Sequence, residues 1–289
     1  MSNTDLIIEE RSRDIGDFLV GRLIPFRKKR MVGPFIFIDH MGPTAIKPGT
    51  YMDIDQHPHI GLSTLTYLLE GEIQHQDSIG TNQHIKAGSV NWMTAGKGVS
   101  HTERTPLELR QGQEFIMHGY QIWVALPKHK EDMEPEFHHL DASKLPQWKD
   151  GAAAFKLIAG KGFDRESPLP VHSHLFMIEI ETQADYKLIV KDQLKGEIGL
   201  CIVEGSIDAC GQIVKEGNML VSKVENACEL TVRSNSKILL FGGETFPEER
   251  FIFWNFVSSD KEKIELAKEL WRNKNFPKVA NDKTYIPLP

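Results

Sequence analysis

Short hydrophobic runs separated by turn-forming residues set the pattern of this chain. Apolar, β-branched and aromatic residues gather in short runs, and glycine or proline interrupts the chain every 8 to 12 residues or so. The clearest runs span residues 34–38, 65–69, 120–124 and 237–241. Such runs between turn signals predict β-strands, and many of them without intervening helices predict sandwiches or barrels. We therefore expect an all-β protein.

A polar segment divides the strand-rich sequence into two blocks. Residues 131–150 are rich in charge and proline, which is typical of a linker. We expect a first β-domain over residues 1–130, a second over 151–250, and a tail over 251–289 that packs back on the barrels. A chain of 289 residues is long enough for two domains of ordinary size. Two strand-rich blocks around one linker suggest a duplicated barrel.

One helix is expected in the tail. Residues 259–262 read Ser-Asp-Lys-Glu, a capping-box pattern in which Ser259 caps the first turn and Glu262 reaches back. Apolar residues then recur at helical spacing and define one face. Its members are Ile264, Ala267, Leu270 and Trp271. We expect this face to pack on a barrel, and Pro277 to prevent continuation of the helix.

Composition and charge narrow the classes of function. The net charge of -6 argues against direct binding to nucleic acid, which needs a basic surface. No stretch approaches the length of a membrane span, and the first residues lack the apolar core of a signal peptide. Cys201, Cys210 and Cys228 show no CxxC spacing, so we expect three reduced thiols and a cytoplasmic protein.

Two short motifs carry candidate metal chemistry. His57-Pro58-His59 places two imidazoles two residues apart, and on a strand such side chains share one face about 6.6 Å apart. His101-Thr102-Glu103 repeats this spacing with an imidazole and a carboxylate. If the two pairs lie on neighbouring strands and point inward, they form a site of three nitrogens and one oxygen. Two adjacent positions would remain for water, dioxygen or substrate.

The distribution of histidine favours the first block as the metal-binding one. An HxH pair alone is weak evidence, because many such pairs bind no metal. All twelve histidines lie at or before position 174. His172 and His174 form another HxH pair, but no later histidine can complete a site with them. We therefore expect one site, in the first block.

Longer motifs resemble a known family. G-x5-T-A-G-x-G-x2-H around His101 is similar to the second motif of the cupin superfamily, and HPH-x4-T-x6-G is similar to the first. The glutamate that usually follows HxH in cupins is absent, since Ser63 and Thr64 stand there, and the carboxylate has moved to Glu103. That displacement resembles the pirin family. The stretches similar to pirins are 32–43, 57–80, 90–103, 120–127 and 250–277.

The resemblance implies a fold, a cofactor and a ligand set. It implies a bicupin, with two β-barrel or jelly-roll cupin domains and a C-terminal helix. It implies one divalent metal ion per chain, held in the N-terminal cupin. The ion in this family is usually iron, so we expect Fe(II). The three histidines and the glutamate of the family correspond to His57, His59, His101 and Glu103. The C-terminal cupin would lack a metal.

The resemblance leaves two classes of function open. Some pirins act as quercetin 2,3-dioxygenases, which open a flavonol ring with O2. Others are metal- and redox-dependent binding partners of transcription factors or metabolic enzymes. A structural metal is a weaker alternative, because structural zinc sites are usually rich in cysteine and the first 200 residues contain none. We favour the oxygenase, with a flavonol-like aromatic substrate and O2, and with a protein as the alternative partner.

Several residues are candidates for supporting roles around the metal. Glu103 is a candidate catalytic base as well as a ligand. Side chains that could hold the ligands in place are His40, Asp39, His75 and Gln121. Apolar residues that either line an aromatic pocket or fill the core are Leu65, Trp92 and Met93. The sequence does not decide which of these roles each residue takes.

Overall fold

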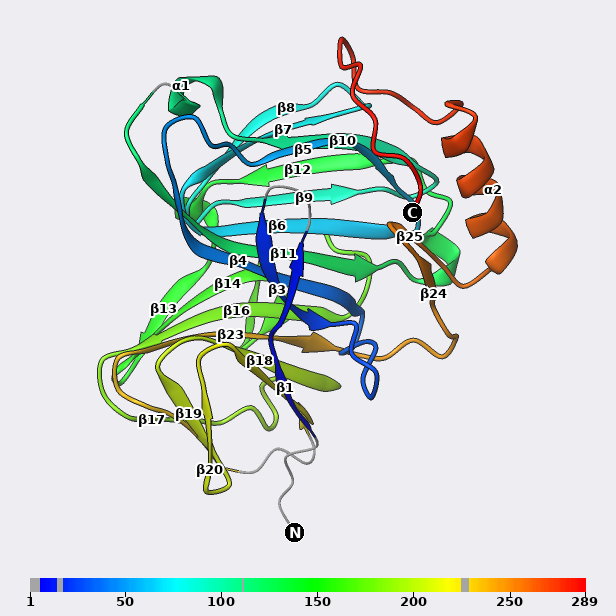
Figure 1. Cartoon of the computed structure of the whole chain (residues 1–289). Coiled ribbons are helices and arrows are strands. Elements are labelled where there is room, and N and C mark those ends of the chain that lie inside the picture. Colours follow the sequence, from blue (N-terminus) through cyan, green and yellow to red (C-terminus); the bar gives the residue numbers. More distant parts are fainter. Residues whose placement is uncertain (1–5, 15–17, 111, 225–228) are drawn as a thin grey trace. The chain divides into compact units, whose positions relative to one another are not determined.

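Antiparallel β-sheets make up nearly all of the regular structure (Figure 1). The computed structural model describes residues 6–14, 18–110, 112–224 and 229–289. Each of its two compact units contains two sheets that share a core of buried aliphatic and aromatic side chains. The expected all-β class is confirmed, with the main helix near the C-terminus as predicted.

The two units are not continuous in sequence. Unit 2 contains Ser12–Val20, Ile38–Ala142 and Pro247–Pro289. Unit 1 contains Gly21–Phe37, Ser143–Phe246 and the described residues before Ser12. The early part of the chain therefore contributes to both units, whereas the sequence suggested a simple order of domains. The roles assigned to the expected domains stay predictions.

The polar segment 131–150 is more structured than a linker. It contains β12 (Glu136–Leu140), which pairs with β9 (Val90–Thr94), and β13 (Gln147–Asp150), which pairs with β14 (Ala153–Gly162). Both are edge strands of their sheets. Edge strands carry charged residues that discourage pairing with other chains. Their charge therefore concealed the strands from the sequence pattern.

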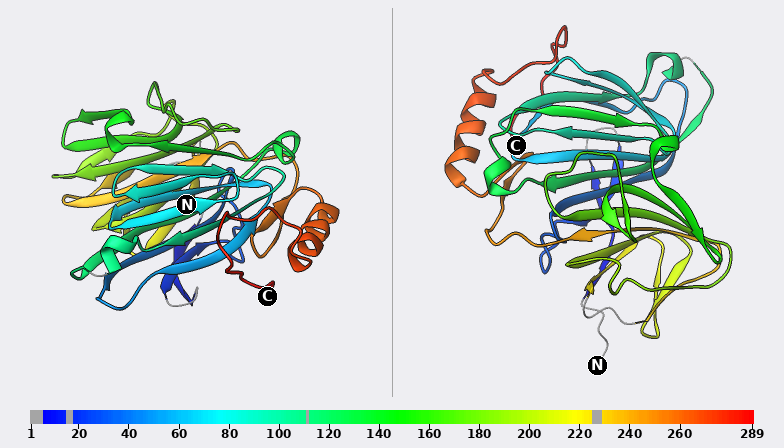
Figure 2. Two further views of the ribbon diagram at one scale, coloured as in Figure 1. Left: turned by 90° about the horizontal axis from the view of Figure 1, so that it is seen from above. Right: turned by 180° about the vertical axis from the view of Figure 1, so that it is seen from behind.

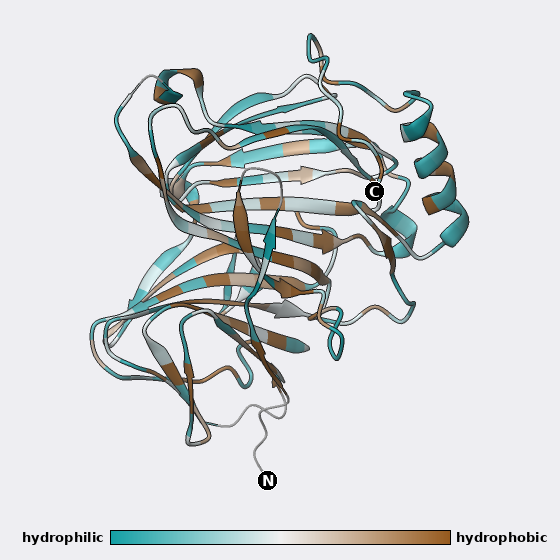
Figure 3. Cartoon of the chain, viewed as in Figure 1, coloured by the Kyte–Doolittle hydropathy of each residue, from teal (hydrophilic) through white to brown (hydrophobic). Residues whose placement is uncertain are grey.

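Unit 1 is built around a large apolar core. Hydrophobic residues dominate its main strands, as Figure 3 shows by their brown colour. The larger sheet runs in the order β1 (Leu6–Glu9), β21 (Asn218–Lys223), β18 (Glu197–Glu204), β23 (Ser236–Gly243), β16 (Leu175–Thr182), β14, β13, with β15 (Arg165–Glu166) paired to β14. The smaller sheet runs β17 (Tyr186–Leu188), β22 (Leu230–Val232), β19 (Ser206–Ala209), β20 (Gln212–Lys215).

Unit 2 carries both candidate metal-binding motifs. Its four-stranded sheet runs β5 (Asp53–His59), β10 (Val99–Arg104), β7 (Glu72–Asp77), β8 (Asn82–Lys86). The sheet that faces it runs β12, β9, β6 (Leu62–Glu70), β11 (Phe115–Ala125), β4 (Phe35–Ile46), β3 (Leu19–Ile24), β2 (Arg11–Asp14). Short helical turns occur at α1 (Leu107–Arg110), η1 (Lys128–Lys130) and η2 (Ala142–Lys144).

The tail folds onto unit 2 through an aromatic cluster. The hairpin of β24 (Phe251–Phe253) and β25 (Phe256–Ser258) leads into α2 (Lys261–Arg272), which lies beside the sheets of unit 2 in both views of Figure 2. The cluster buries Ile60, Phe256, Ile264, Ala267, Trp271 and Phe276. The predicted apolar face is thus buried except for Leu270, which is 36% exposed.

The helix begins one residue later than the capping box implied. Asp260 is the N-cap, and its side chain accepts a hydrogen bond from the backbone N–H of Glu262. Ser259 instead donates its backbone N–H to Glu131 at 2.8 Å. Aspartate caps a helix as well as serine does, so the sequence pattern alone could not separate the two positions.

Two further expectations concern location. Among the described residues, neither α-helix has the length and apolar character that crossing a membrane requires. Cys201 is a free, buried thiol, but Cys210 is disulfide-bonded, so the expectation of reduced thiols is wrong for Cys210. Cys228 lies outside the described residues. The cytoplasmic location stays a prediction.

We expect Trp271→Ala to destabilise the protein by about 3–5 kcal/mol, since large-to-small changes in a core leave a cavity. The side chain is 2% exposed, stacks on Tyr285 at 4.6 Å, and donates Nε1–H to the Ile286 carbonyl. The matched control is Leu266→Ala on the same helix, which is 56% exposed and should change stability by less than about 0.5 kcal/mol. Urea denaturation measures both. Equal effects of the two changes would contradict the packing described above.

Candidate metal centre

Three neighbouring strands of unit 2 place six polar side chains on one face. β10 lies between β5 and β7, and His101 is opposite His57 on one side and Asp77 on the other. His59, His75 and Glu103 follow at intervals of two residues, so they share the same face. A register shift between His101 and Glu103 marks a bulge, a device that re-aims a side chain within a strand. The two sequence motifs therefore lie on neighbouring strands and share one face.

The turn after His59 requires glycine. Gly61 has a φ of +67°, and a Cβ there would lie 1.9 Å from the Val257 carbonyl oxygen. Only glycine adopts this conformation without strain and allows such a close backbone approach. The turn leads directly from β5 into β6, which carries Thr64 and Thr66. It thus brings a second sheet over the histidines.

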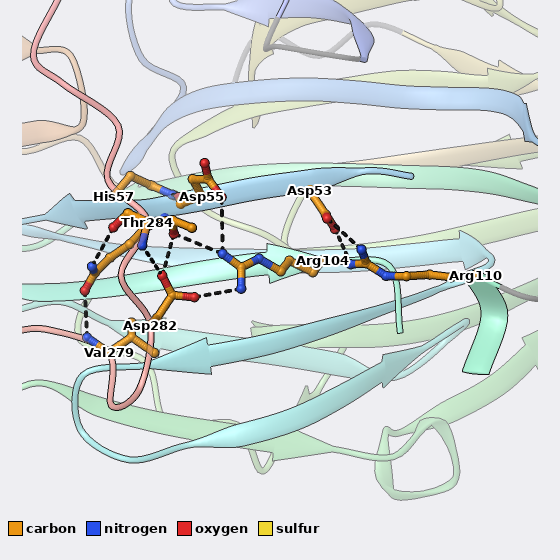
Figure 4. Close-up of polar contacts among 9 residues, drawn as sticks. Asp53, Asp55, His57, Arg104, Arg110, Val279, Asp282 and Thr284 are labelled. Atoms are coloured by element: carbon orange, nitrogen blue, oxygen red, sulfur yellow. Dashed lines mark hydrogen bonds and ion pairs between the residues drawn. The ribbon is translucent and has the colours of Figure 1, made fainter. Parts of the chain in front are cut away.

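The outer face of the same strands is covered by the C-terminal segment (Figure 4). Gln56, directly before His57, donates its side-chain amide to the Thr284 carbonyl at 3.0 Å and accepts from the Val279 N–H at 2.7 Å. Arg104 pairs with Asp282 at 2.7 Å. Strand alternation thus gives β5 and β10 two functions, with site residues on one face and contacts to the tail on the other.

The three histidines converge at a separation suited to one metal ion. The ligand atoms of His57, His59 and His101 all lie within 4.8 Å of one another. The Nε2 atoms of His59 and His101 are 3.1 Å apart. Two nitrogens that each lie about 2.1 Å from one ion are separated by about 3 Å. His57 donates Nδ1–H to the Asp55 carbonyl at 2.8 Å, which leaves its Nε2 lone pair available.

Glu103 lies beside this triad but belongs to a second group. Its carboxylate is within 4.8 Å of His75 and His101, so that His101 is common to both groups. The Thr66 hydroxyl lies 3.0 Å from Glu103 Oε1 and 2.9 Å from Gln121 Oε1. One hydroxyl proton can be given to either oxygen. The structure therefore places Glu103 next to the histidines, with the Thr66 hydroxyl as its hydrogen-bond donor.

Burial sets the charge state of the site. It lowers the pKa of His57 to about 4, and it lowers the pKa of His59 and of His101 well below the ordinary value, with repulsion from neighbouring imidazoles adding to the effect. Neutral imidazole is the form that binds metals. Burial also raises the pKa of Glu103, against opposing effects of His75 and Thr66. Three neutral imidazoles and a carboxylate suit a divalent transition metal.

The supporting residues divide into those the structure brings to the site and those it does not. His75 contacts His101, with 3.3 Å between their Nδ1 atoms, and Gln121 reaches Glu103 through Thr66. His40 instead contacts His118 at 2.9 Å. Among the described residues, no candidate metal-binding group of three includes His40 or Asp39. Sequence spacing could not show which of the four candidates reach the site.

Strand pairing also sorts the expected pocket residues. Thr66 faces Glu103, so its neighbour Leu65 lies on the opposite face of β6, and Trp92, which pairs with Leu65, lies there too. Met93 shares the site face with its partner Phe137. Leu65 and Trp92 therefore fill the core. Phe137 was not anticipated, because it lies in the segment expected to be a linker.

Asp77 was also missed, although the sequence held a signal for it. It follows His75 by two residues, the same spacing as in the HPH and HTE motifs. Its Oδ2 is 3.2 Å from His75 Nε2. Burial alone would raise the pKa of Asp77, but hydrogen bonds from His75 and Thr81 outweigh burial and hold the pKa below its ordinary value. Asp77 is therefore a buried carboxylate beside the histidines.

Comparison with known proteins identifies the family. The chain matches the family profile described as "Pirin" over residues 18–124 and that described as "Pirin C-terminal cupin domain" over residues 176–277. A pirin-like protein of Caulobacter vibrioides is 42% identical over 99% of both chains. A Pseudomonas aeruginosa relative, named for a proposed quercetin 2,3-dioxygenase activity, is 34% identical over 91% of this chain and 82% of its own.

A solved structure agrees with these matches. Quercetin 2,3-dioxygenase from Acinetobacter baumannii superposes with a TM-score of 0.89 at 33% identity, covering 98% of this chain and 94% of that one. The expected bicupin fold is thereby confirmed. The family profiles and the relative from Caulobacter vibrioides agree over nearly the whole chain, which therefore belongs to the pirin family.

Proposed function

We propose that this protein is a metal-dependent oxygenase of the quercetin 2,3-dioxygenase type. One divalent ion, Fe(II), would be held by His57, His59, His101 and Glu103, and the C-terminal cupin would hold none. The observation that carries the proposal is the convergence of three buried, neutral imidazoles, two of them with nitrogens 3.1 Å apart. The names of the relatives from Pseudomonas aeruginosa and Acinetobacter baumannii support the choice of reaction.

The chain's own residues would bind and orient the substrate and would accept its proton. When bound, a divalent ion supplies Lewis acidity, a template for substrate and redox chemistry with O2. Glu103 would accept the proton of a flavonol hydroxyl, and its raised pKa suits a base that works near neutral pH. Once Glu103 is protonated, Thr66 can turn its own proton to Gln121 Oε1 and accept from the carboxyl group instead. Thr66, with Gln121 as its second partner, can therefore form a hydrogen bond with both the ionised and the protonated form of Glu103.

We expect one metal ion per chain, bound in unit 2. Changing His57→Ala together with His101→Ala removes two of three imidazole ligands and should abolish stoichiometric binding. The matched control is His172→Ala together with His174→Ala, which alters the HxH pair of unit 1 and should leave the content at one ion. The measurement is metal analysis after anaerobic loading with Fe(II) and gel filtration. Two ions in the wild type, or one in the first double variant, would contradict the proposed site.

We expect the metal-free protein to lose stability as the pH falls from about 6.5 toward 4. An unfolded histidine titrates near 6.5, whereas the pKa of folded His57 is about 4. Between these values the unfolded chain binds more protons, so stability is fully present above about 6.5 and is lost as the pH falls. His57 alone accounts for about 2 kcal/mol at pH 5.

Urea denaturation of the chelator-treated protein across this pH range measures the effect. His57→Gln, which does not titrate, should show a shallower dependence of stability on pH. The same slope in the wild type and the variant would mean that His57 is not held neutral by burial.

We expect Glu103→Gln to separate catalysis from binding. Loss of a general base typically costs about 10²–10⁴-fold in rate. Single-turnover oxidation of a flavonol is measured at matched iron occupancy, with Glu72→Gln as the control, since Glu72 contacts His84 rather than the site. Equal rates for Glu103→Gln and wild type would rule out the role as base. Negligible flavonol oxidation and O2 uptake by the iron-loaded wild type would overturn the oxygenase in favour of a regulatory binding protein.

A further inference from the structure

A chain of buried polar contacts runs from β7 to the face of His101 that meets His59. Asp77 Oδ2 lies 3.2 Å from His75 Nε2, and His75 Nδ1 lies 3.3 Å from His101 Nδ1. The other ring nitrogen of His101, Nε2, is the one 3.1 Å from His59. All four side chains are at most 2% exposed. Each contact therefore constrains where the protons of its neighbours lie.

The direction of this chain is set at Asp77. Its Oδ1 accepts hydrogen bonds from the backbone N–H groups of Ile79 at 3.1 Å and Thr81 at 2.9 Å. A carboxylate can only accept, so its Oδ2 requires a proton on His75 Nε2. In its neutral form an imidazole carries a single N–H, so this form of His75 has no proton on Nδ1 and presents that nitrogen as an acceptor. His75 Nδ1 can then only accept from His101 Nδ1–H.

We propose that Asp77 and His75 fix the tautomer of His101, keeping its proton on Nδ1 and its Nε2 lone pair directed to the metal position. This inference rests on the proposed function, because it takes His101 to be a metal ligand. Asp77 and His75 are positioning residues, since they act through His101. A partner of this kind typically changes metal affinity by 10–100-fold.

His57 and His101 differ in how they are held. His57 uses a backbone carbonyl, that of Asp55, which no side-chain substitution removes. His101 depends on the side chain of His75, whose ring is itself stacked on Phe137 with 4.8 Å between centroids. A change at Asp77 therefore alters the contact between His75 and His101 and leaves the contact of His57 with the Asp55 carbonyl in place. That selectivity makes the proposal testable by isosteric substitution.

The decisive variant is Asp77→Asn, which keeps the size and shape of the side chain but replaces one acceptor oxygen with an NH2 group that donates. Two backbone N–H groups require an oxygen at the Oδ1 position, so the new NH2 group takes the Oδ2 position and donates to His75 Nε2. His75 then carries its proton on Nδ1, and His101 is forced to carry its own on Nε2. We expect the dissociation constant for Zn²⁺, measured by competition with a chromophoric chelator, to rise 10–100-fold.

The matched control is Asp185→Asn in unit 1. Asp185 also accepts from one backbone N–H, that of Ser234, and from one side chain, that of Arg233, each at 2.8 Å. No histidine takes part in these contacts. The control should leave the Zn²⁺ affinity within about twofold of the wild type.

A second pair of variants decides the matter if Asp77→Asn does not fold. In His75→Gln, the amide oxygen can accept from His101 and the NH2 can donate to Asp77, so the original direction is retained. His75→Leu removes both groups. We expect Zn²⁺ affinity to stay within a few-fold in His75→Gln and to fall 10–100-fold in His75→Leu. Equal affinities in these two variants would overturn the proposal.

Nitrogen-15 NMR of histidine side chains reads the tautomer without any metal. We expect His101 to be protonated at Nδ1 in the metal-free wild type and at Nε2 in Asp77→Asn. Nε2 protonation in the wild type, or unchanged Zn²⁺ affinity in a folded Asp77→Asn, would overturn the relay while leaving the metal site intact. Failure of the wild type to bind Zn²⁺ would instead count against the proposed metal site, whatever tautomer is seen.

Discussion

The antiparallel register of β5, β10 and β7 is the constraint on which the site depends. It aligns His57, His101 and Asp77 across three strands, so that residues far apart in sequence share one face. Because side chains alternate along a strand, a slip of one residue would turn every one of them to the other face. The same slip would also detach Gln56 and Arg104 from the tail. Register is thus fixed from both sides of the sheet.

Burial gives these side chains their chemistry. An isolated charge is costly in a low-dielectric interior, so imidazoles stay neutral there unless a counter-charge is present. Asp77 is the exception, because two backbone N–H groups and His75 share its charge. The site therefore combines three neutral imidazoles with two buried carboxyl groups, those of Glu103 and of Asp77. That arrangement suits a divalent cation better than a proton.

Much of this could be predicted from sequence, and the failures have physical causes. The i, i+2 spacing of His57 with His59 and of His101 with Glu103 depends only on strand geometry, so each pair could be placed on one face from local pattern. The pairing of β5 with β10, which brings the two pairs together, could be stated only as a condition. The facing of Leu65 and Trp92 depends on pairing with other strands, which no local pattern encodes. The two strands in 131–150 were hidden by the charges that edges require. The place of Asp77 in the site could not be predicted without knowing that β7 pairs with β10.

The contacts of the C-terminal segment bear on how the protein is made. β5 and β10 are complete once residue 104 has been synthesised, yet Gln56 and Arg104 find their partners in Val279, Asp282 and Thr284. Those residues are synthesised after residues 143–246 of unit 1. During synthesis the outer face of β5 therefore stays uncovered while residues 143–246 of unit 1 are made, and the strand that carries two of the histidines gains these contacts only after residue 284 has been added.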